Sequence, residues 1–83
     1  MCEKLTDFLN DIPHAKVSIY RETYDGTEWL VDESWASNIA EIEEKYNKAT
    51  ASEETYAFRD LEIMNLKYTN IGRGLPYFDI EVQ

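Results

Sequence analysis

Cysteine, histidine, glycine and proline are scarce in this sequence, and long apolar runs are missing. The single cysteine, Cys2, excludes an intramolecular disulfide and a zinc site of the Cys-x-x-Cys type, and we interpret it as an incidental thiol. No apolar run approaches the roughly 20 residues that cross a bilayer, and the N-terminus lacks the apolar core of a secretory signal. These absences predict a soluble protein of the cytoplasm. If a phage encodes the chain, the cytoplasm in question is that of the host cell.

Signatures of common catalytic and metal sites are also missing. The sequence contains no G-x-S-x-G motif, Walker A loop, H-E-x-x-H motif or EF-hand loop. Asp7, Asp11 and the only histidine, His14, recur at helical spacing. Pro13 removes an amide and ends the helix before His14, so the three side chains do not gather as metal ligands. We therefore predict that the protein is not an enzyme and uses no metal or cofactor.

The composition is that of one small folded domain, residues 1–83. Hydrophobic residues make up 43% of the chain and aromatic residues 13%, which is typical of a globule rather than of a disordered segment. A domain of this length buries only about 60–65% of the surface that its unfolded chain exposes, so we expect a small core.

Two segments have the apolar spacing of amphipathic helices. The first covers residues 3–11 and ends before Pro13; its apolar face consists of Leu5, Phe8, Leu9 and Ile12. The second follows Ser34 as a helix N-cap. Its apolar stripe consists of Trp35, Ile39, Ile42, Tyr46 and Ala49.

Residues 15–34 have the alternation of a β-hairpin around Asp25-Gly26. A three-residue loop, 24–26, sorts the two faces better than a two-residue Asp25-Gly26 loop, because it sets Ile19 opposite Val31. The same register sets Arg21 opposite Trp29, turns Trp29 inward and Leu30 outward, and makes Glu22 and Glu28 unfavourable cross-strand neighbours.

The C-terminal third predicts a second pair of strands. In residues 56–70 the alternation changes phase, which a bulge near Met64 or Asn65 would restore. A helical turn through Phe58 is an alternative, and residues 52–60 stay open between helix and strand. Residues 76–83 alternate as a closing strand. The fold class is therefore α+β, a four-stranded, mainly antiparallel sheet with two helices on one face, in the order α-β-β-α-β-β.

Charge is the unusual property of this chain. Seventeen acidic and eight basic residues give a net charge of −9, which repels nucleic acids and anionic membranes and favours basic partners. The proposed outer face of the sheet gathers carboxylates that stand about 6.5–7 Å apart along a strand, on the scale of the phosphates of a DNA strand. The predicted partner-binding residues are Tyr20, Glu22, Glu28, Asp32, Asp60, Glu62, Tyr77, Asp79 and Glu81.

In size, acidity and mixed helix-and-sheet build, the chain resembles the small inhibitors made by phages and mobile elements, the anti-CRISPR and antirestriction proteins, several of which mimic DNA. The resemblance covers the general character of the whole chain and no motif, so no residue role carries over. It implies an inhibitor that binds the basic nucleic-acid-binding surface of a larger protein.

A second hypothesis is a non-catalytic interaction or assembly module. In this case the acidic face is only solvated, and the partner docks elsewhere or a second copy pairs at a sheet edge. Both hypotheses exclude direct binding of nucleic acid and of membranes, and both allow a monomer or a homodimer.

Overall fold

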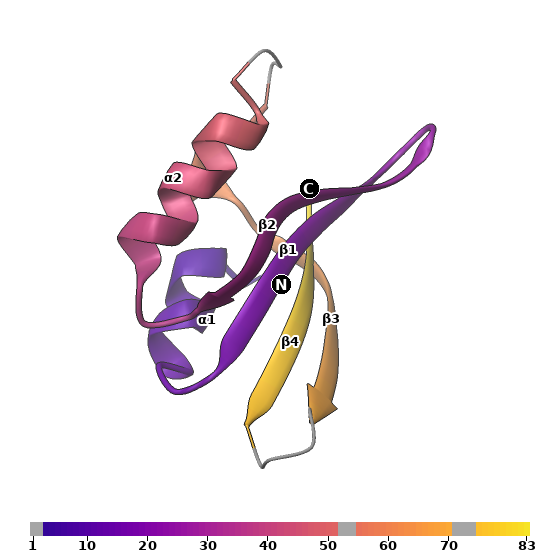
Figure 1. Cartoon of the computed structure of the whole chain (residues 1–83). Coiled ribbons are helices and arrows are strands. Elements are labelled where there is room, and N and C mark those ends of the chain that lie inside the picture. Colours follow the sequence, from indigo (N-terminus) through magenta and orange to yellow (C-terminus); the bar gives the residue numbers. More distant parts are fainter. Residues whose placement is uncertain (1–2, 52–54, 71–74) are drawn as a thin grey trace.

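The computed structural model describes residues 3–51, 55–70 and 75–83 of the chain. Its elements are α1 (Leu5–Asp11), β1 (Lys16–Thr23), β2 (Gly26–Trp35), α2 (Ile39–Ala49), the 3-10 turn η1 (Phe58–Asp60), β3 (Ile63–Asn70) and β4 (Pro76–Val82). The predicted α+β class and the order α-β-β-α-β-β are confirmed (Figure 1).

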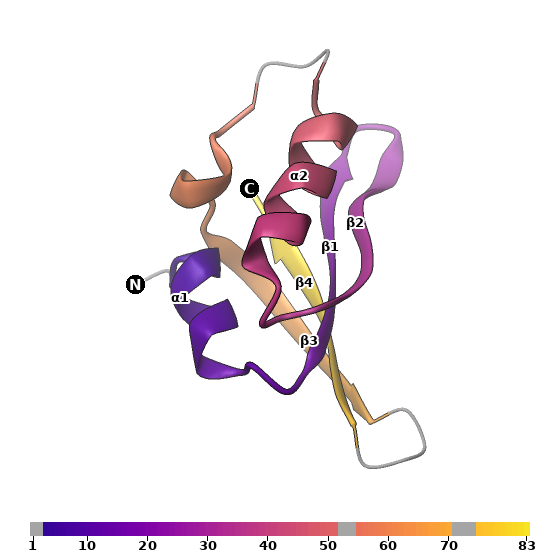
Figure 2. The same ribbon diagram turned by 60° about the vertical axis from the view of Figure 1, so that its left-hand side comes forward.

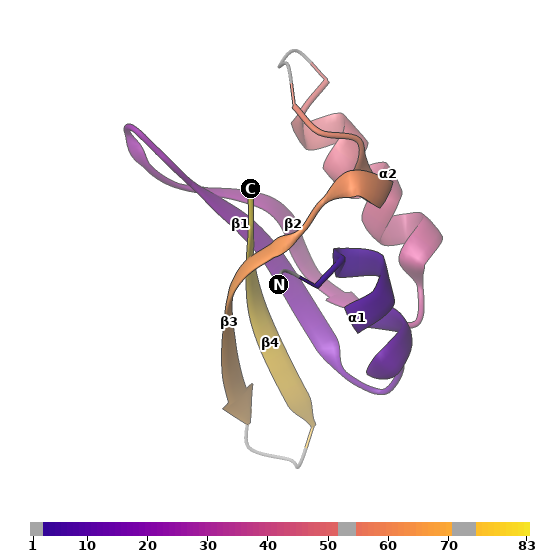
Figure 3. The same ribbon diagram turned by 180° about the vertical axis from the view of Figure 1, so that it is seen from behind.

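The four strands form one mixed sheet in the order β2-β1-β4-β3. β1 pairs with β2 and β3 pairs with β4 in antiparallel fashion, whereas the central pair β1–β4 is parallel. Both helices lie on the same side of this sheet, in front of the strands in Figure 2. The helices stand to the left of the strands in Figure 1 and to the right in the reverse view of Figure 3, so no helix of the described chain covers the other side. One sheet face is therefore left to solvent or to a partner.

The core lies between the helices and the sheet. Leu5 and Leu9 of α1 and Ile42 of α2 are completely buried, and so are Ile19 of β1 and Ile80 of β4. Alternate residues of a strand point to opposite faces, so β1 and β4 each direct one row of side chains into this core. Burial of each such side chain stabilises the fold by about 1.5–3 kcal/mol.

The second helix begins later than the sequence predicts. α2 starts at Ile39 with Asn38 as N-cap, whose side chain accepts a hydrogen bond from the Glu41 N–H. The prediction of Ser34 as the cap is wrong, because β2 stays paired with β1 as far as Trp35. The first helix also starts slightly later than predicted, at Leu5.

The hairpin turn differs from both predicted loops. Tyr24 and Asp25 form the loop, and Gly26 opens β2 with a φ of 127°, a conformation that favours glycine. Pairing close to the turn sets Arg21 opposite Glu28, so the predicted pair of Arg21 with Trp29 is wrong.

An irregularity in β2 then restores part of the predicted register. The pairing shifts between Ile19 and Tyr20, which brings Ile19 opposite Val31 as predicted. The shift inserts Leu30, which is buried at 5% exposure, whereas Trp29 is 53% exposed. The predicted orientations of Trp29 and Leu30 are therefore wrong.

The C-terminal hairpin follows the prediction more closely. A register shift between Ile63 and Asn65 confirms the bulge expected at this point. Before it, Phe58–Asp60 forms a 3-10 turn, which agrees with the helical alternative for that segment. Residues 52–54 and Cys2 lie outside the described residues. No helix in the described part of the chain is long and apolar enough to cross a membrane.

Candidate functional site

The uncovered side of the sheet, here called the helix-free face, carries side chains from β1 and β4. The parallel register sets Ser18 beside Asp79 and Tyr20 beside Glu81. Tyr77 also lies there, because its hydroxyl is hydrogen-bonded to the hydroxyl of Ser18. Of the nine predicted partner-binding residues, five share this face: Tyr20, Glu22, Tyr77, Asp79 and Glu81.

Tyr20 is at the centre of the acidic part of this face. Burial, and then the negative charges of Glu81, Glu22 and Asp79, raise the pKa of the Tyr20 phenol above its ordinary value of 10.0. The strand register agrees with this: Glu81 stands beside Tyr20 on β4, Asp79 lies two residues before Glu81, and Glu22 lies two residues after Tyr20 on β1. Glu22 accepts a hydrogen bond from the Thr27 hydroxyl at 3.0 Å, which fixes one of them.

Trp29 lies on the edge strand β2, where it contacts Tyr20 of this face and also borders the space between β2 and α2, and sequence reasoning missed it. Its ring lies 5.1 Å from that of Tyr20, with an interplanar angle of 47°. Because the indole is half exposed and the tyrosine is partly buried, the pair forms an accessible aromatic surface. One signal in the sequence could have revealed the observed register. The predicted register sets Glu22 against Glu28, and this unfavourable like-charge pair argued for a different pairing of the two strands.

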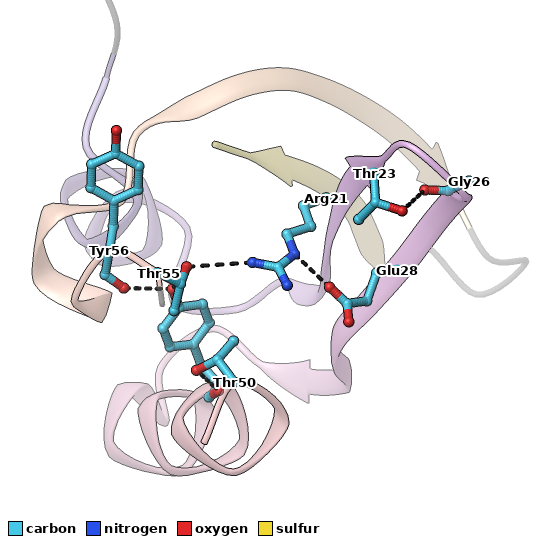
Figure 4. A network of polar contacts seen from close by, with 8 residues as sticks. Arg21, Thr23, Gly26, Glu28, Thr50, Thr55 and Tyr56 are labelled. Atoms are coloured by element: carbon cyan, nitrogen blue, oxygen red, sulfur yellow. Dashed lines mark hydrogen bonds and ion pairs between the residues drawn. The ribbon is translucent and has the colours of Figure 1, made fainter. Parts of the chain in front are cut away.

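Glu28 does not lie on the helix-free face. The turn sets it opposite Arg21, whose Nε donates to Glu28 Oε1 at 2.5 Å. The guanidinium also donates to the Thr55 hydroxyl, on the side of the sheet that carries the helices (Figure 4). The predicted repulsion with Glu22 is therefore replaced by an ion pair.

Three more of the predicted residues lie elsewhere. Asp32 lines an open hollow of about 410 Å³ between β2 and α2, whose other walls are Trp29, Leu30, Lys45, Lys48 and Ala49. Asp60 is in η1 rather than in a strand. Glu62 precedes β3, and its backbone forms an isolated antiparallel β-bridge with the backbone of Lys4. Local alternation could not place Asp60 and Glu62, because residues 55–61 form a 3-10 turn with irregular flanks and no strand.

Two lysines further reduce the acidity of the helix-free face. Lys67 of β3 stands in register with Asp79. Lys16 of β1 forms an ion pair with Glu33 at 2.8 Å and places its Nζ 4.8 Å from the centroid of the Trp35 ring. The predicted continuous array of seven carboxylates is thus reduced to the three around Tyr20.

Nothing in the described residues assembles a metal site, since no group of three or more histidine, cysteine, aspartate or glutamate side chains is close enough to hold an ion. What the face offers is an aromatic pair bordered by carboxylates, an arrangement suited to binding cationic groups. Comparison with protein-family models, with curated proteins and with solved structures finds no match to this chain.

Proposed function

We propose that this protein is a small acidic inhibitor whose helix-free face docks on the basic nucleic-acid-binding surface of a larger protein. The observation that carries the proposal is the register that sets Glu81 beside Tyr20, with Asp79 and Glu22 two residues away along β4 and β1, on a sheet face that no described helix covers. In this proposal these three carboxylates take the places of phosphates. The Tyr20–Trp29 pair, with its rings tilted at 47° to each other, supplies the apolar anchor that stable interfaces need.

The overall charge supports the same interaction at longer range. A net charge of −9 accelerates encounter with a basic surface, and the acceleration declines as salt screens it. Nucleic acid and the inhibitor would then compete for one surface. Binding that is insensitive to salt would contradict this mechanism.

The test begins with capture of partners from the host on the immobilised protein. A captured nucleic-acid-binding protein should lose its nucleic acid, and its activity, as the inhibitor is added. The double variant Asp79→Lys and Glu81→Lys should weaken this inhibition at least tenfold without unfolding the domain. Inhibition that survives the double variant would refute the proposed docking face.

The matched control changes the same charge on a different surface. Glu43→Lys with Glu44→Lys alters two exposed positions of α2, away from the sheet face. We expect a loss of only about twofold to threefold, because this variant affects long-range attraction and no docking contact.

A second candidate, a non-catalytic assembly module, is favoured by the exposed side of β3. Backbone bonds from Leu5 to Leu61 and from Ile63 to Glu3 cover the start of this strand. Beyond them Leu66 and Tyr68 are 41% and 57% exposed. If β3 is the contact, Leu66→Lys should abolish self-association in sedimentation experiments, and charge reversal on β4 should not.

A further inference from the structure

The helix-free face contains one cation already seated on an aromatic ring. Lys16 Nζ lies 4.8 Å from the centroid of the Trp35 ring and 2.8 Å from Glu33 Oε1. The ammonium group is thus held between a ring and a carboxylate. The chain itself supplies the cation at this position.

The Tyr20–Trp29 pair has the same two components without a cation from the described chain. Trp29 on β2, Tyr20 on β1 and Glu81 on β4 form one row across three neighbouring strands. Glu22 lies two residues along β1, about 6.5–7 Å from Tyr20. Within residues 3–51, 55–70 and 75–83, neither Glu22 nor Glu81 forms an ion pair, and no cation lies over the Tyr20 or Trp29 ring.

We propose that this row is a binding site for an arginine side chain of the partner protein, with the guanidinium stacked on the Trp29 indole and donating to Glu81 and Glu22. The proposal rests on the proposed function and specifies its contact chemistry. It requires charge complementarity, which Glu81, Asp79 and Glu22 provide through their places in the register beside Tyr20, and an accessible ring, which the 53% exposure of Trp29 provides.

Arginine fits this row better than lysine for geometric reasons. The guanidinium is planar, so it lies flat on an aromatic ring while its N–H groups remain free to donate in the ring plane. Its fork reaches carboxylates in two directions, here across the sheet to Glu81 and along β1 to Glu22. An ammonium group is a compact, strongly hydrated charge and gains less from the same surroundings.

The experiment compares nona-arginine with nona-lysine as probes of the full chain, by calorimetry at one fixed ionic strength. Both peptides carry the same number of side-chain charges, so the long-range electrostatic attraction contributes equally to both affinities. The ratio of the two affinities therefore reports the difference between guanidinium and ammonium contacts. We expect nona-arginine to bind about two- to fivefold more tightly. In a Trp35→Phe background, nona-arginine should also change the fluorescence of Trp29, because the guanidinium contacts that indole.

Two leucine variants provide the decisive comparison. Trp29→Leu should bring the ratio close to one while leaving nona-lysine affinity nearly unchanged. Trp35→Leu is the matched control, because Trp35 is similarly exposed at 44% but already holds Lys16; the ratio should persist in this variant. Circular dichroism of both variants verifies their folds.

The proposal is overturned if neither peptide binds, if the two bind equally, or if Trp29→Leu leaves the ratio intact. The fluorescence measurement is independent of any substitution at Trp29, and an unchanged signal would also count against the site. Failure of the proposed function has a different signature: the arginine preference would be present, yet no nucleic-acid-binding protein would be inhibited.

Discussion

Replacement of Tyr46 by phenylalanine tests the contacts that hold α2 against the rest of the fold. Tyr46 is buried at 1% exposure, and its hydroxyl donates to the Tyr56 carbonyl at 2.6 Å. Since that proton is used, the Thr55 hydroxyl donates to Tyr46 Oη at 3.0 Å and in turn accepts from Arg21 Nη1 at 3.4 Å. This relay joins β1, the chain before η1 and α2 (Figure 4).

The expected loss follows from the two bonds that end at the Tyr46 oxygen. Each contributes about 0.5–1.5 kcal/mol net, and water can replace the lost partner because Tyr56 is 57% exposed and Thr55 is partly exposed. Tyr46→Phe should therefore lower the free energy of unfolding by about 1–2 kcal/mol. In a domain of this size that corresponds to a fall in Tm of about 5–15 °C.

Thermal and urea unfolding followed by circular dichroism measure this change. Tyr56→Phe is the matched control, because it removes the same hydroxyl from an exposed ring. A double-mutant cycle with Thr55→Val should give a favourable coupling of about 0.5–1 kcal/mol. Equal stabilities of Tyr46→Phe and Tyr56→Phe would refute the role of the relay.

Three further substitutions test other parts of the structure. Because burial and three carboxylates raise the pKa of Tyr20 above 10.0, its folded form keeps the proton longer than its unfolded form. Stability is therefore expected to fall as the pH rises beyond about 10, and to fall less steeply in Tyr20→Phe; equal slopes in urea unfolding would contradict the assignment. Gly26→Ala should cost about 1–2 kcal/mol from the φ of 127° alone, since nothing lies within 4 Å of an added Cβ, and thermal unfolding checks it. Ile80→Ala, at a completely buried position of a central strand, should cost about 2–5 kcal/mol in the same assay, and a loss below 1 kcal/mol would show that the site is not core.

The sequence was sufficient for the fold class because element types depend on local periodicity. Alternation predicted the strands, including the phase change that the bulge between Ile63 and Asn65 produces. Local patterns contain no information on which strands become neighbours. The parallel contact of β1 with β4, which places Tyr20 beside Glu81, joins segments about 60 residues apart and arises only when the whole core assembles.

The candidate site was predicted less well because one inserted residue decides which side chains reach the helix-free face. Strict alternation turns Glu28 outward and Trp29 inward, whereas Leu30 as an extra buried residue reverses both. The observed register avoids the repulsion between Glu22 and Glu28. Glu28 instead forms an ion pair with Arg21, and Glu22 accepts a hydrogen bond from Thr27. Cross-strand electrostatics near the turn was thus a better guide than hydrophobic sorting.

Charge reversals at two different places separate two contributions to binding: long-range attraction by the net charge, and direct contact by particular carboxylates. The double charge reversals on β4 and on α2 both change the net charge from −9 to −5, so both should slow association by a similar factor and flatten its dependence on salt to a similar extent. Only the β4 variant removes carboxylates beside the Tyr20–Trp29 pair, so only this variant should accelerate dissociation, by about tenfold. Surface plasmon resonance on a captured partner resolves the two rates. Equal dissociation rates for the two variants would mean that this protein attracts its partner through overall charge and contacts it through another surface.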